Sequence, residues 1–445
     1  MQQTETQLKV RHYPLLKELE NEERQEISEK GMRRRSVAIS LLQEYQRLPM
    51  QPTLVSSADG ALEGLHLNIP AYALSGPNNP LWNIYQDLIQ KLPPHTHLHI
   101  LTHESVYAPM EEWLQSQELM PRVKLYALPD SCKMTVWAED DFELVLDKAD
   151  DTLFMVQPHS NRRTGDENAS HYSSSFFNWP RVKVPIYFEG GNILVGDNFF
   201  FVGADYGVNT FLDMQSSLNP EQYDRLNRLV CERFKKYLDH ERKLFLIGST
   251  VQIPSEKRVE FEMNGEKWEE EYYHHNTEGT VQPVFHIDMF ITLAGRNEAG
   301  KYQVLVGDPQ QAASILDHDF ITRLNPMAFD DIAATLSRLG FEVIRNPLPL
   351  VYVDDLESKL RKWYYASYNN VLVEITSPTD KTVWLPTYGH GNWEQLKRTD
   401  EENKAIWEKL GFKVVLLTDF HPFAEFSGSV HCIKKYVKRN SIKAE

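Results

Sequence analysis

The 445-residue sequence contains few cysteines, and it shows neither the apolar core of a signal peptide nor a long apolar run. Its 3 cysteines, Cys132, Cys231 and Cys432, cannot close a disulfide framework, so we expect reduced thiols and a cytoplasmic protein. Residues 1–9 are polar, and no run is long enough to cross a bilayer. Secretion by a route that needs no signal peptide is compatible with this N-terminal sequence.

Positive charge is also scarce. The formal net charge of -16 disfavours nucleic acid and anionic membranes as partners, because both bind through a positive field, and it suits a cationic substrate. Apolar residues make up 41% and charged residues 25%, as in ordinary globular proteins with a large core. Leu15–Arg47 carries an apolar stripe at helical spacing that ends at Pro49 and Pro52. We therefore predict a helical extension over residues 1–60 and one main domain over residues 61–445.

One unit of strand, strand, helix and strand occurs three times in the second half of the chain. Its first copy has strands in Ile193–Val202, a helix over Pro220–Tyr237 and a strand over Lys243–Ile247. The next copies run from Met289 to Ile344 and from Val371 to Leu417. Such a unit buries one face only by packing against its copies, so the repeat predicts an α/β fold built as a closed ring or a layered stack.

Two segments combine small residues with a reactive side chain. Phe426–Ile433 places a Gly-Ser approach and β-branched neighbours around Cys432, which can hold a thiol at the rim of a sheet. Earlier in the chain, Glu189 precedes two glycines that let the backbone approach a ligand closely. Both have structural alternatives, because a free cysteine is often a small core residue and Glu189 could cap a turn.

Two further segments bring acidic residues into apolar patterns. His286 and Asp288 are two apart, so in a strand both side chains point to one face. In Met134–Val145, predicted as a strand, Asp140 faces one side, while Asp141 and a solvated or paired Glu139 face the other. A satisfied polar pair and a solvated edge are the structural alternatives. Two charged insertions, expected as solvated loops although such loops can also act as lids, are Ser160–Trp179 and Ser255–Gln282.

Together these segments resemble the guanidino-group-modifying enzymes of the pentein superfamily, especially agmatine deiminase and bacterial peptidylarginine deiminase. The resemblance covers residues 95–440 and rests on the order of four motifs, Trp137-x-x-Asp140, Glu189-Gly-Gly-Asn, His286-Ile-Asp288 and Gly428-Ser-Val-His-Cys432. It implies a five-bladed α/β propeller of strand-strand-helix-strand blades, with residues 61–445 as the catalytic domain. It requires neither a metal ion nor another cofactor. The residues to which it assigns catalytic roles are Cys432, His286 and Glu189, and those to which it assigns substrate binding are Asp140, Asp288, Trp137 and Asn370.

The activity implied by the resemblance is deimination. A guanidinium is planar and charged, so a site for it needs carboxylates in fixed geometry. The thiolate of Cys432, whose pKa we expect to be depressed, would attack the central carbon while His286 protonates the leaving ammonia. Water would then hydrolyse the thiouronium intermediate to a ureido, citrulline-like product.

The sequence leaves other functions open. An amidinotransferase would use the same residues but pass the group to an amine, and a non-catalytic module would only bind arginine. The substrate could be arginine, agmatine or a protein arginine, and the oligomeric state is not specified. The family pattern reads Trp-x-Arg-Asp, whereas this chain has Glu139 in the Arg position, which reverses a charge beside the pocket.

Overall fold

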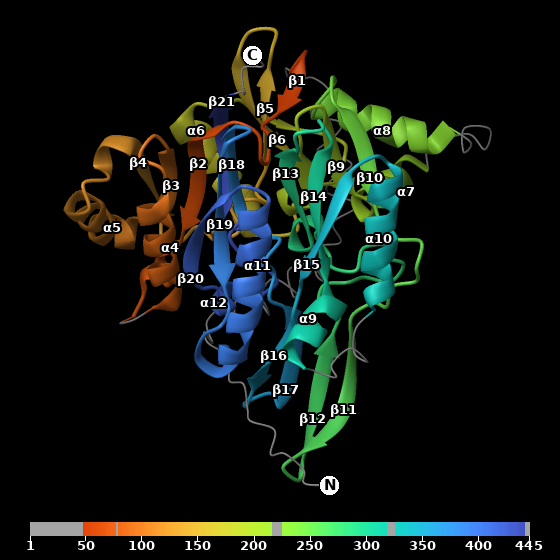
Figure 1. Cartoon of the computed structure of the whole chain (residues 1–445). Coiled ribbons are helices and arrows are strands. Elements are labelled where there is room, and N and C mark those ends of the chain that lie inside the picture. The colour runs from red at the N-terminus through yellow and green to blue at the C-terminus, as the bar shows by residue number, and fades with distance from the viewer. Residues whose placement is uncertain (1–47, 77–78, 216–224, 318–324, 441–445) are drawn as a thin grey trace.

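The computed structural model describes residues 48–76, 79–215, 225–317 and 325–440. Within these ranges the strands form sheets of three or four strands that share a large apolar core, with helices along their outer sides (Figure 1). The predicted helical extension falls mainly on residues 1–47, outside the described residues. The sheets begin ahead of residue 60, because β1 (Pro52–Leu54) pairs with β5 (Glu143–Asp147).

Five sheets repeat one arrangement, in which an antiparallel pair is followed by a helix and then by a parallel strand. A parallel strand needs a crossover connection, and the helix supplies it. The first sheet and its helix are β2 (Ala61–Ile69), α4 (Pro80–Lys91), β3 (His97–His103), β4 (Val123–Leu128) and β21 (Lys434–Asn440), and the second comprises β5, β6 (Thr152–Gln157), α6 (Thr164–Phe177), β7 (Arg181–Lys183) and β1. The third comprises β8 (Ile193–Val195), β9 (Phe199–Gly203), α7 (Ala204–Gln215), α8 (Leu226–Tyr237) and β10 (Lys243–Ile247). The fourth comprises β13 (Ile291–Arg296), β14 (Tyr302–Asp308), α9 (Pro309–Leu316), α10 (Pro326–Arg338) and β15 (Glu342–Pro347). The fifth consists of β18 (Leu372–Ser377), β19 (Asp380–Thr387), α11 (Lys397–Lys409) and β20 (Lys413–Asp419).

The repeat predicted for the second half is confirmed, and the first half follows it too. In each of the three predicted copies the first two strands pair antiparallel and the third joins the second in parallel. The first and last parts of the chain complete one sheet, because β21 pairs with β2. No closed sheet occurs within the described residues, so the five-bladed propeller stays a prediction.

A further sheet projects from one end of the molecule (Figure 1). Its strands, in spatial order, are β11 (Lys257–Met263), β12 (Glu266–Tyr272), β17 (Leu360–Tyr365) and β16 (Leu350–Asp355). The prediction of a solvated loop over Ser255–Gln282 is therefore wrong. Trp268 and Tyr272 are buried within this charged hairpin, and the Tyr272 ring stacks on Trp363 at a centroid distance of 6.1 Å.

The prediction of a solvated loop over Ser160–Trp179 is also wrong, because this segment contains α6. Its composition of serine and asparagine is typical of loops, yet Ala169 is buried beside Leu101 and Leu128 and so attaches the helix to the face of β3 and β4. Ser170 satisfies its hydroxyl by donating to the carbonyl of Asp166, one turn back in the same helix. This helix places residues 160–163 at the site described below.

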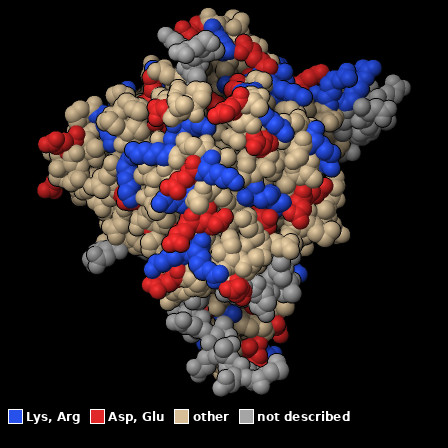
Figure 2. All heavy atoms as spheres, viewed as in Figure 1, with Lys and Arg blue, Asp and Glu red and all other residues tan. Residues whose placement is uncertain are grey.

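Four further helices complete the described fold, and no helix among the described residues is long and apolar enough to span a membrane. Figure 2 shows acidic and basic side chains interspersed over the viewed face, so the excess of negative charge is not gathered there into a single patch. The remaining helices of four or more residues are α3 (Ala71–Leu74), α5 (Glu104–Ser116), η6 (Gly391–Leu396) and α12 (His421–Ala424).

Candidate active site

Cys432 lies in a turn directly before β21, as its Gly-Ser approach predicts. Ser427 adopts a left-handed backbone with φ of 62°, which turns the chain into this approach. The indole of Trp137 lies against Gly428 so closely that a Cβ at that position would overlap the ring. Glycine at 428 is therefore required for Trp137 to form a wall next to the thiol segment.

Asn370 holds the cysteine from both its backbone and its side chain. Its Oδ1 accepts from the backbone N–H of Cys432 at 3.2 Å and from that of His431 at 2.8 Å. Its Nδ2 donates to Cys432 Sγ at 3.2 Å. All three residues are buried, so the position of the sulfur is fixed by hydrogen bonds that water does not weaken.

Asp288 lies on the other side of the sulfur. Its Oδ2 is 3.6 Å from Cys432 Sγ and 2.9 Å from His431 Nδ1. Its Oδ1 is buried and has no hydrogen-bond partner among the described residues. A buried carboxylate oxygen without a donor is costly, which marks this point as a place where a ligand can donate a hydrogen bond.

Glu189 and His286 form the opposite wall. Glu189 Oε2 lies 2.7 Å from His286 Nε2 and accepts from the hydroxyl of Tyr206 at 2.6 Å. Gly191 packs directly on the imidazole, because a Cβ there would overlap Nδ1 and would lie 3.2 Å from Asp288 Oδ2. The Glu-Gly-Gly motif thus needs glycine at 191 so that the Glu189 loop and the His286 turn can meet.

Asp140 completes the site together with two arginines of the chain. Asp140 Oδ1 accepts from the backbone N–H of Gly191 at 3.4 Å and lies 3.8 Å from His286 Nδ1. Arg163 donates to Asp140 Oδ2 at 3.2 Å. The Nε of Arg162 donates to Glu189 Oε1 at 3.1 Å, and its Nη2 lies 3.9 Å from Asp140 Oδ2.

The protonation of the site follows from this packing. Burial disfavours the charged form of Glu189, but Arg162 and His286 outweigh it, so the pKa of Glu189 is lowered. Burial likewise opposes a charge on His286, yet Asp140 and Glu189 raise its pKa. Burial, Asp288 and Asp140 raise the pKa of Cys432 well above its ordinary value. The prediction of a depressed thiol pKa is wrong for the free protein, because burial and the two nearby carboxylates disfavour a negative charge on the sulfur.

The structure brings all seven predicted site residues to this region, but not on the predicted strands. Residues 134–142 are irregular, with a turn at 138–140, and the strand starts only at Glu143. His286 directly precedes a 3₁₀ turn, η4 (Ile287–Met289), and Asp288 lies within it, while Glu189 precedes a second 3₁₀ turn, η2 (Gly190–Asn192). Tight turns replace the strand alternation that was predicted to set the direction of these side chains.

Neither neighbour of Asp140 is solvated, and of the two alternatives predicted for Glu139 the paired one is confirmed. Asp141 is fully buried, and its Oδ2 accepts from Asn68 at 2.6 Å; burial and Asp166 raise its pKa well above the ordinary value. Glu139 is buried and paired with Lys434 and Lys435. The reversed charge at residue 139 is therefore balanced within the protein and does not face the pocket unpaired.

Sequence reasoning missed four residues of the site. His431 directly precedes Cys432 in the Gly-Ser-Val-His-Cys motif, and this position was the signal that could have identified it as the partner of Asp288. Tyr206 lies at the start of α7, where the sequence carries no signal for it. Arg162 and Arg163 were hidden in a segment taken for a loop, although two adjacent arginines in a chain with a charge of -16 are a detectable feature.

Ligand atoms of Asp140, Glu189 and His286 lie within 4.8 Å of one another, close enough to hold a metal ion. Two arginine side chains reach the same carboxylates, and His286 has a raised pKa, so this donor set favours a hydrogen-bonding organic cation over a metal. Glu256, Glu271 and His274 form another group of this kind on the projecting sheet.

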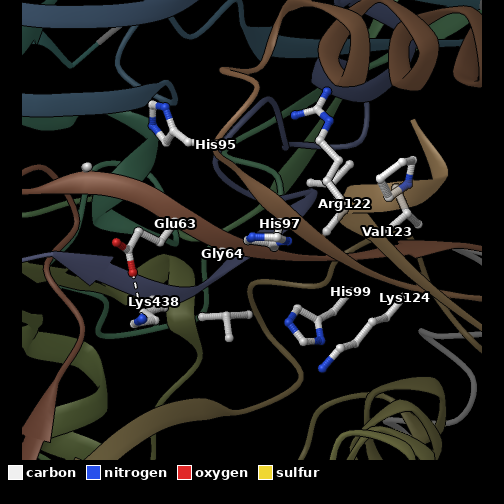
Figure 3. Close-up of a pocket in the computed structure, with 13 residues that line it drawn as sticks. Glu63, Gly64, His95, His97, His99, Arg122, Val123, Lys124 and Lys438 are labelled. Carbon is white, nitrogen blue, oxygen red and sulfur yellow. Dashed lines mark ion pairs between the residues drawn. The ribbon is translucent and has the colours of Figure 1, made fainter. Parts of the chain in front are cut away.

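A separate cavity of about 760 Å³ lies over β2, β3 and β4 and contains none of the predicted site residues (Figure 3).

Known proteins match this chain in structure and not in sequence. No protein-family model and no curated protein matches it. The agmatine deiminase of C. jejuni superposes with a TM-score of 0.53 at 13% identity, over 88% of this chain and 98% of the other. A candidate arginine deiminase from Porphyromonas gingivalis gives 0.55 at 12% over 88% and 99%, and the agmatine deiminase of Enterococcus faecalis gives 0.52 at 13% over 90% and 99%. The chain has the fold of the agmatine deiminases.

On this deiminase fold, the raised pKa of Cys432 makes a prediction about its reactivity. Only the thiolate attacks iodoacetamide readily, so labelling of Cys432 in the free protein should be slow at neutral pH and should rise steeply toward alkaline pH. Peptide mapping after brief labelling gives the rate, with the half-buried Cys132 as an internal reference. Fast labelling of Cys432 that does not change between neutral and alkaline pH would contradict the protonation state described above.

Proposed function

We propose that this protein is a guanidino-group hydrolase, a deiminase that converts a guanidinium into a ureido group and releases ammonia through a covalent Cys432 intermediate. We further propose that the five repeated sheets are the blades of a propeller, with the site near its centre. The fold shared with the agmatine deiminases supports this assignment, and the residues of the site supply the chemistry.

One observation carries the proposal. Two buried carboxylates of the site, Glu189 and Asp140, already hold guanidinium groups, namely those of Arg162 and Arg163. The charge and spacing of these carboxylates therefore suit the planar fork of a guanidinium. The free Oδ1 of Asp288 adds an acceptor beside the sulfur, where a third edge of a substrate guanidinium could donate.

The first half of the reaction would start from a neutral thiol and a protonated His286. A guanidinium that enters between Asp288 and Asp140 offsets their negative charge, which lowers the pKa of Cys432. The thiol proton can pass to Asp288 Oδ2, 3.6 Å away. The thiolate then attacks the central carbon, and His286 donates its proton to the departing ammonia, leaving an amidino group bonded to sulfur.

The second half would use the same imidazole as a base. Neutral His286, oriented by Glu189 at 2.7 Å, accepts a proton from water as the water oxygen attacks the amidino carbon. The carbon–sulfur bond breaks as the hydroxyl proton of the intermediate passes to the sulfur, so the ureido product leaves, Cys432 is again a neutral thiol and His286 is protonated again. The proton that Asp288 accepted passes to the ammonia, which leaves as ammonium. The hydroxyl of Tyr206 donates to Glu189 and stabilises its charged form, so Glu189 holds the imidazole in place without taking its proton.

We propose a small guanidino compound as the substrate, as in the agmatine deiminases whose fold the chain shares. Incubation with agmatine, free arginine and an arginine peptide tests the activity, with ammonia and ureido product measured in parallel. Product should form without any added amine and should be absent with Cys432→Ala. Product that forms only when an amine acceptor is added would favour an amidinotransferase.

Arg162 provides a further prediction. Its guanidinium occupies part of the place where a substrate would bind, so an external guanidinium has to displace it. Arg162→Gln should therefore lower the Kd for agmatine by about tenfold in the Cys432→Ala background, because an internal competitor reduces apparent affinity. Calorimetry measures this, and Arg181→Gln on the exposed start of β7 is the control. A weaker complex in Arg162→Gln would instead identify Arg162 as a direct contact of the substrate.

A further inference from the structure

A buried group of four charges, the Glu139 cluster, lies directly behind the candidate site. Glu139 accepts from Lys434 Nζ at 2.7 Å and from Lys435 Nζ at 3.0 Å. Lys435 also donates to Glu143 at 2.9 Å. The four side chains are at most one tenth exposed, with Lys434 completely buried. None of them is among the residues that the deiminase resemblance assigns to the reaction.

The Glu139 cluster touches three segments of the site at once. Glu139 directly precedes Asp140, and its backbone N–H donates to the carbonyl of Cys432 at 3.1 Å. The two lysines lie two and three residues after Cys432, at the start of β21. Gly190 packs against the same cluster, because a Cβ there would overlap the Glu139 carbonyl oxygen and Lys435 Nζ. The loops that carry Asp140, Glu189 and Cys432 therefore meet on one set of ion pairs.

Such buried pairs contribute little net stability, because the cost of removing each charge from water offsets their attraction. They do fix geometry, since each ammonium must reach its carboxylate at hydrogen-bond distance. Lys434 also lies over the ring of Tyr436, with its Nζ 3.6 Å from the centroid, which restricts it further. A catalytic site loses activity steeply when its groups shift by about 1 Å, so a cluster that ties these loops together affects the reaction through them.

We propose that Glu139, acting with Lys434 and Lys435, is a positioning residue that fixes Asp140 and the Glu189 loop relative to Cys432. This inference rests on the proposed function. It also explains the departure from the family pattern, because the glutamate in the place of an arginine is matched by two lysines after the cysteine. The cluster acts through Asp140 and the neighbouring backbone, and it does not touch the substrate.

The test uses the full-length protein and compares four variants. Glu139→Gln removes the carboxylate that Lys434 and Lys435 share, which leaves the buried ammonium of Lys434 without its partner. The double variant Glu139→Gln/Lys434→Met removes that ammonium as well. The matched controls are Glu63→Gln and Lys438→Gln, since this pair is 2.7 Å apart on β2 and β21, with Lys438 exposed (Figure 3). Each variant is characterised by its Tm, by KM and kcat for agmatine, and by the rate at which iodoacetamide labels Cys432.

In Glu139→Gln, KM should rise at least about tenfold and labelling of Cys432 should change several-fold, while the controls match the wild type. The double variant should regain thermal stability without regaining KM, which a purely structural role does not predict. Activity that returns together with Tm in the double variant would overturn the proposal. So would unchanged KM and labelling in Glu139→Gln. If the wild type converts no guanidine, the proposed function fails, and labelling of Cys432 still decides the role of the cluster.

Discussion

Replacement of Cys432 by alanine is expected to abolish turnover and to leave the substrate bound. The sulfur would form the bond to the central carbon, so its removal takes away the covalent path and should lower kcat by at least about four powers of ten. The carboxylates that would hold the guanidinium stay in place, because Cys432 contributes no charge to them. Steady-state kinetics and calorimetry with agmatine measure the two effects separately.

The other two cysteines provide the matched controls. Cys231 lies on α8 and Cys132 follows β4 with its sulfur against Tyr172, so neither is near the site. Cys132→Ala and Cys231→Ala should each retain wild-type kcat. Turnover that survives in Cys432→Ala, or is lost in one of the controls, would require a different nucleophile. A protein that binds agmatine with the wild-type cysteine and converts none would fit the non-catalytic module.

Asp140→Asn is expected to remove almost all activity. Asp140 is buried, contacts Arg163 and faces His286, and in the proposed reaction it accepts the substrate guanidinium. Loss of one partner from a buried charged pair costs about 3–5 kcal/mol, which corresponds to roughly two to four powers of ten in rate. The loss should appear in kcat/KM, measured with variants shown to be folded by circular dichroism.

Asp141→Asn serves as the matched control, for a reason that differs from the predicted one. The predicted reason was that Asp141 faces away from Asp140, whereas the structure shows a fully buried carboxyl group with a raised pKa. A neutral aspartic acid that accepts from Asn68 can be replaced by the amide, whose oxygen accepts the same bond. Most activity should remain in Asp141→Asn. Equal losses in the two variants would mean that the acidic segment acts as one unit and that Asp140 has no special role.

The repeats were predictable, because each depends on local patterns that the sequence carries. Paired apolar strands followed by a helix and a third strand gave the sheets of β8, β13 and β18 close to their observed bounds. The projecting sheet was missed, since its strands β12 and β17 are far apart in the sequence and pair only in the folded chain. The neighbouring strand β11 is charged and largely exposed, so its composition resembles that of a loop.

The residues of the candidate site were easier to predict than the backbone that carries them. His286 precedes the 3₁₀ turn and Asp288 lies within it, yet both side chains reach Gly191, so the right pair followed from the wrong element. Arg162 and Glu139 show the opposite case, because their partners are distant in sequence and nothing local indicates Glu189 or Lys434. Contacts between loops of different sheets are set by tertiary packing, which no short pattern records.

Turnover of agmatine in water enriched in oxygen-18 tests the central claim most directly. In the proposed reaction the ureido oxygen comes from the water that attacks the Cys432 adduct, so every product molecule should be heavier by the mass difference between the two isotopes. Ammonia should appear in equal amount, and mass spectrometry of the product in ordinary water gives the reference. Product without the label, or no ureido product from any guanidino compound, would contradict the account.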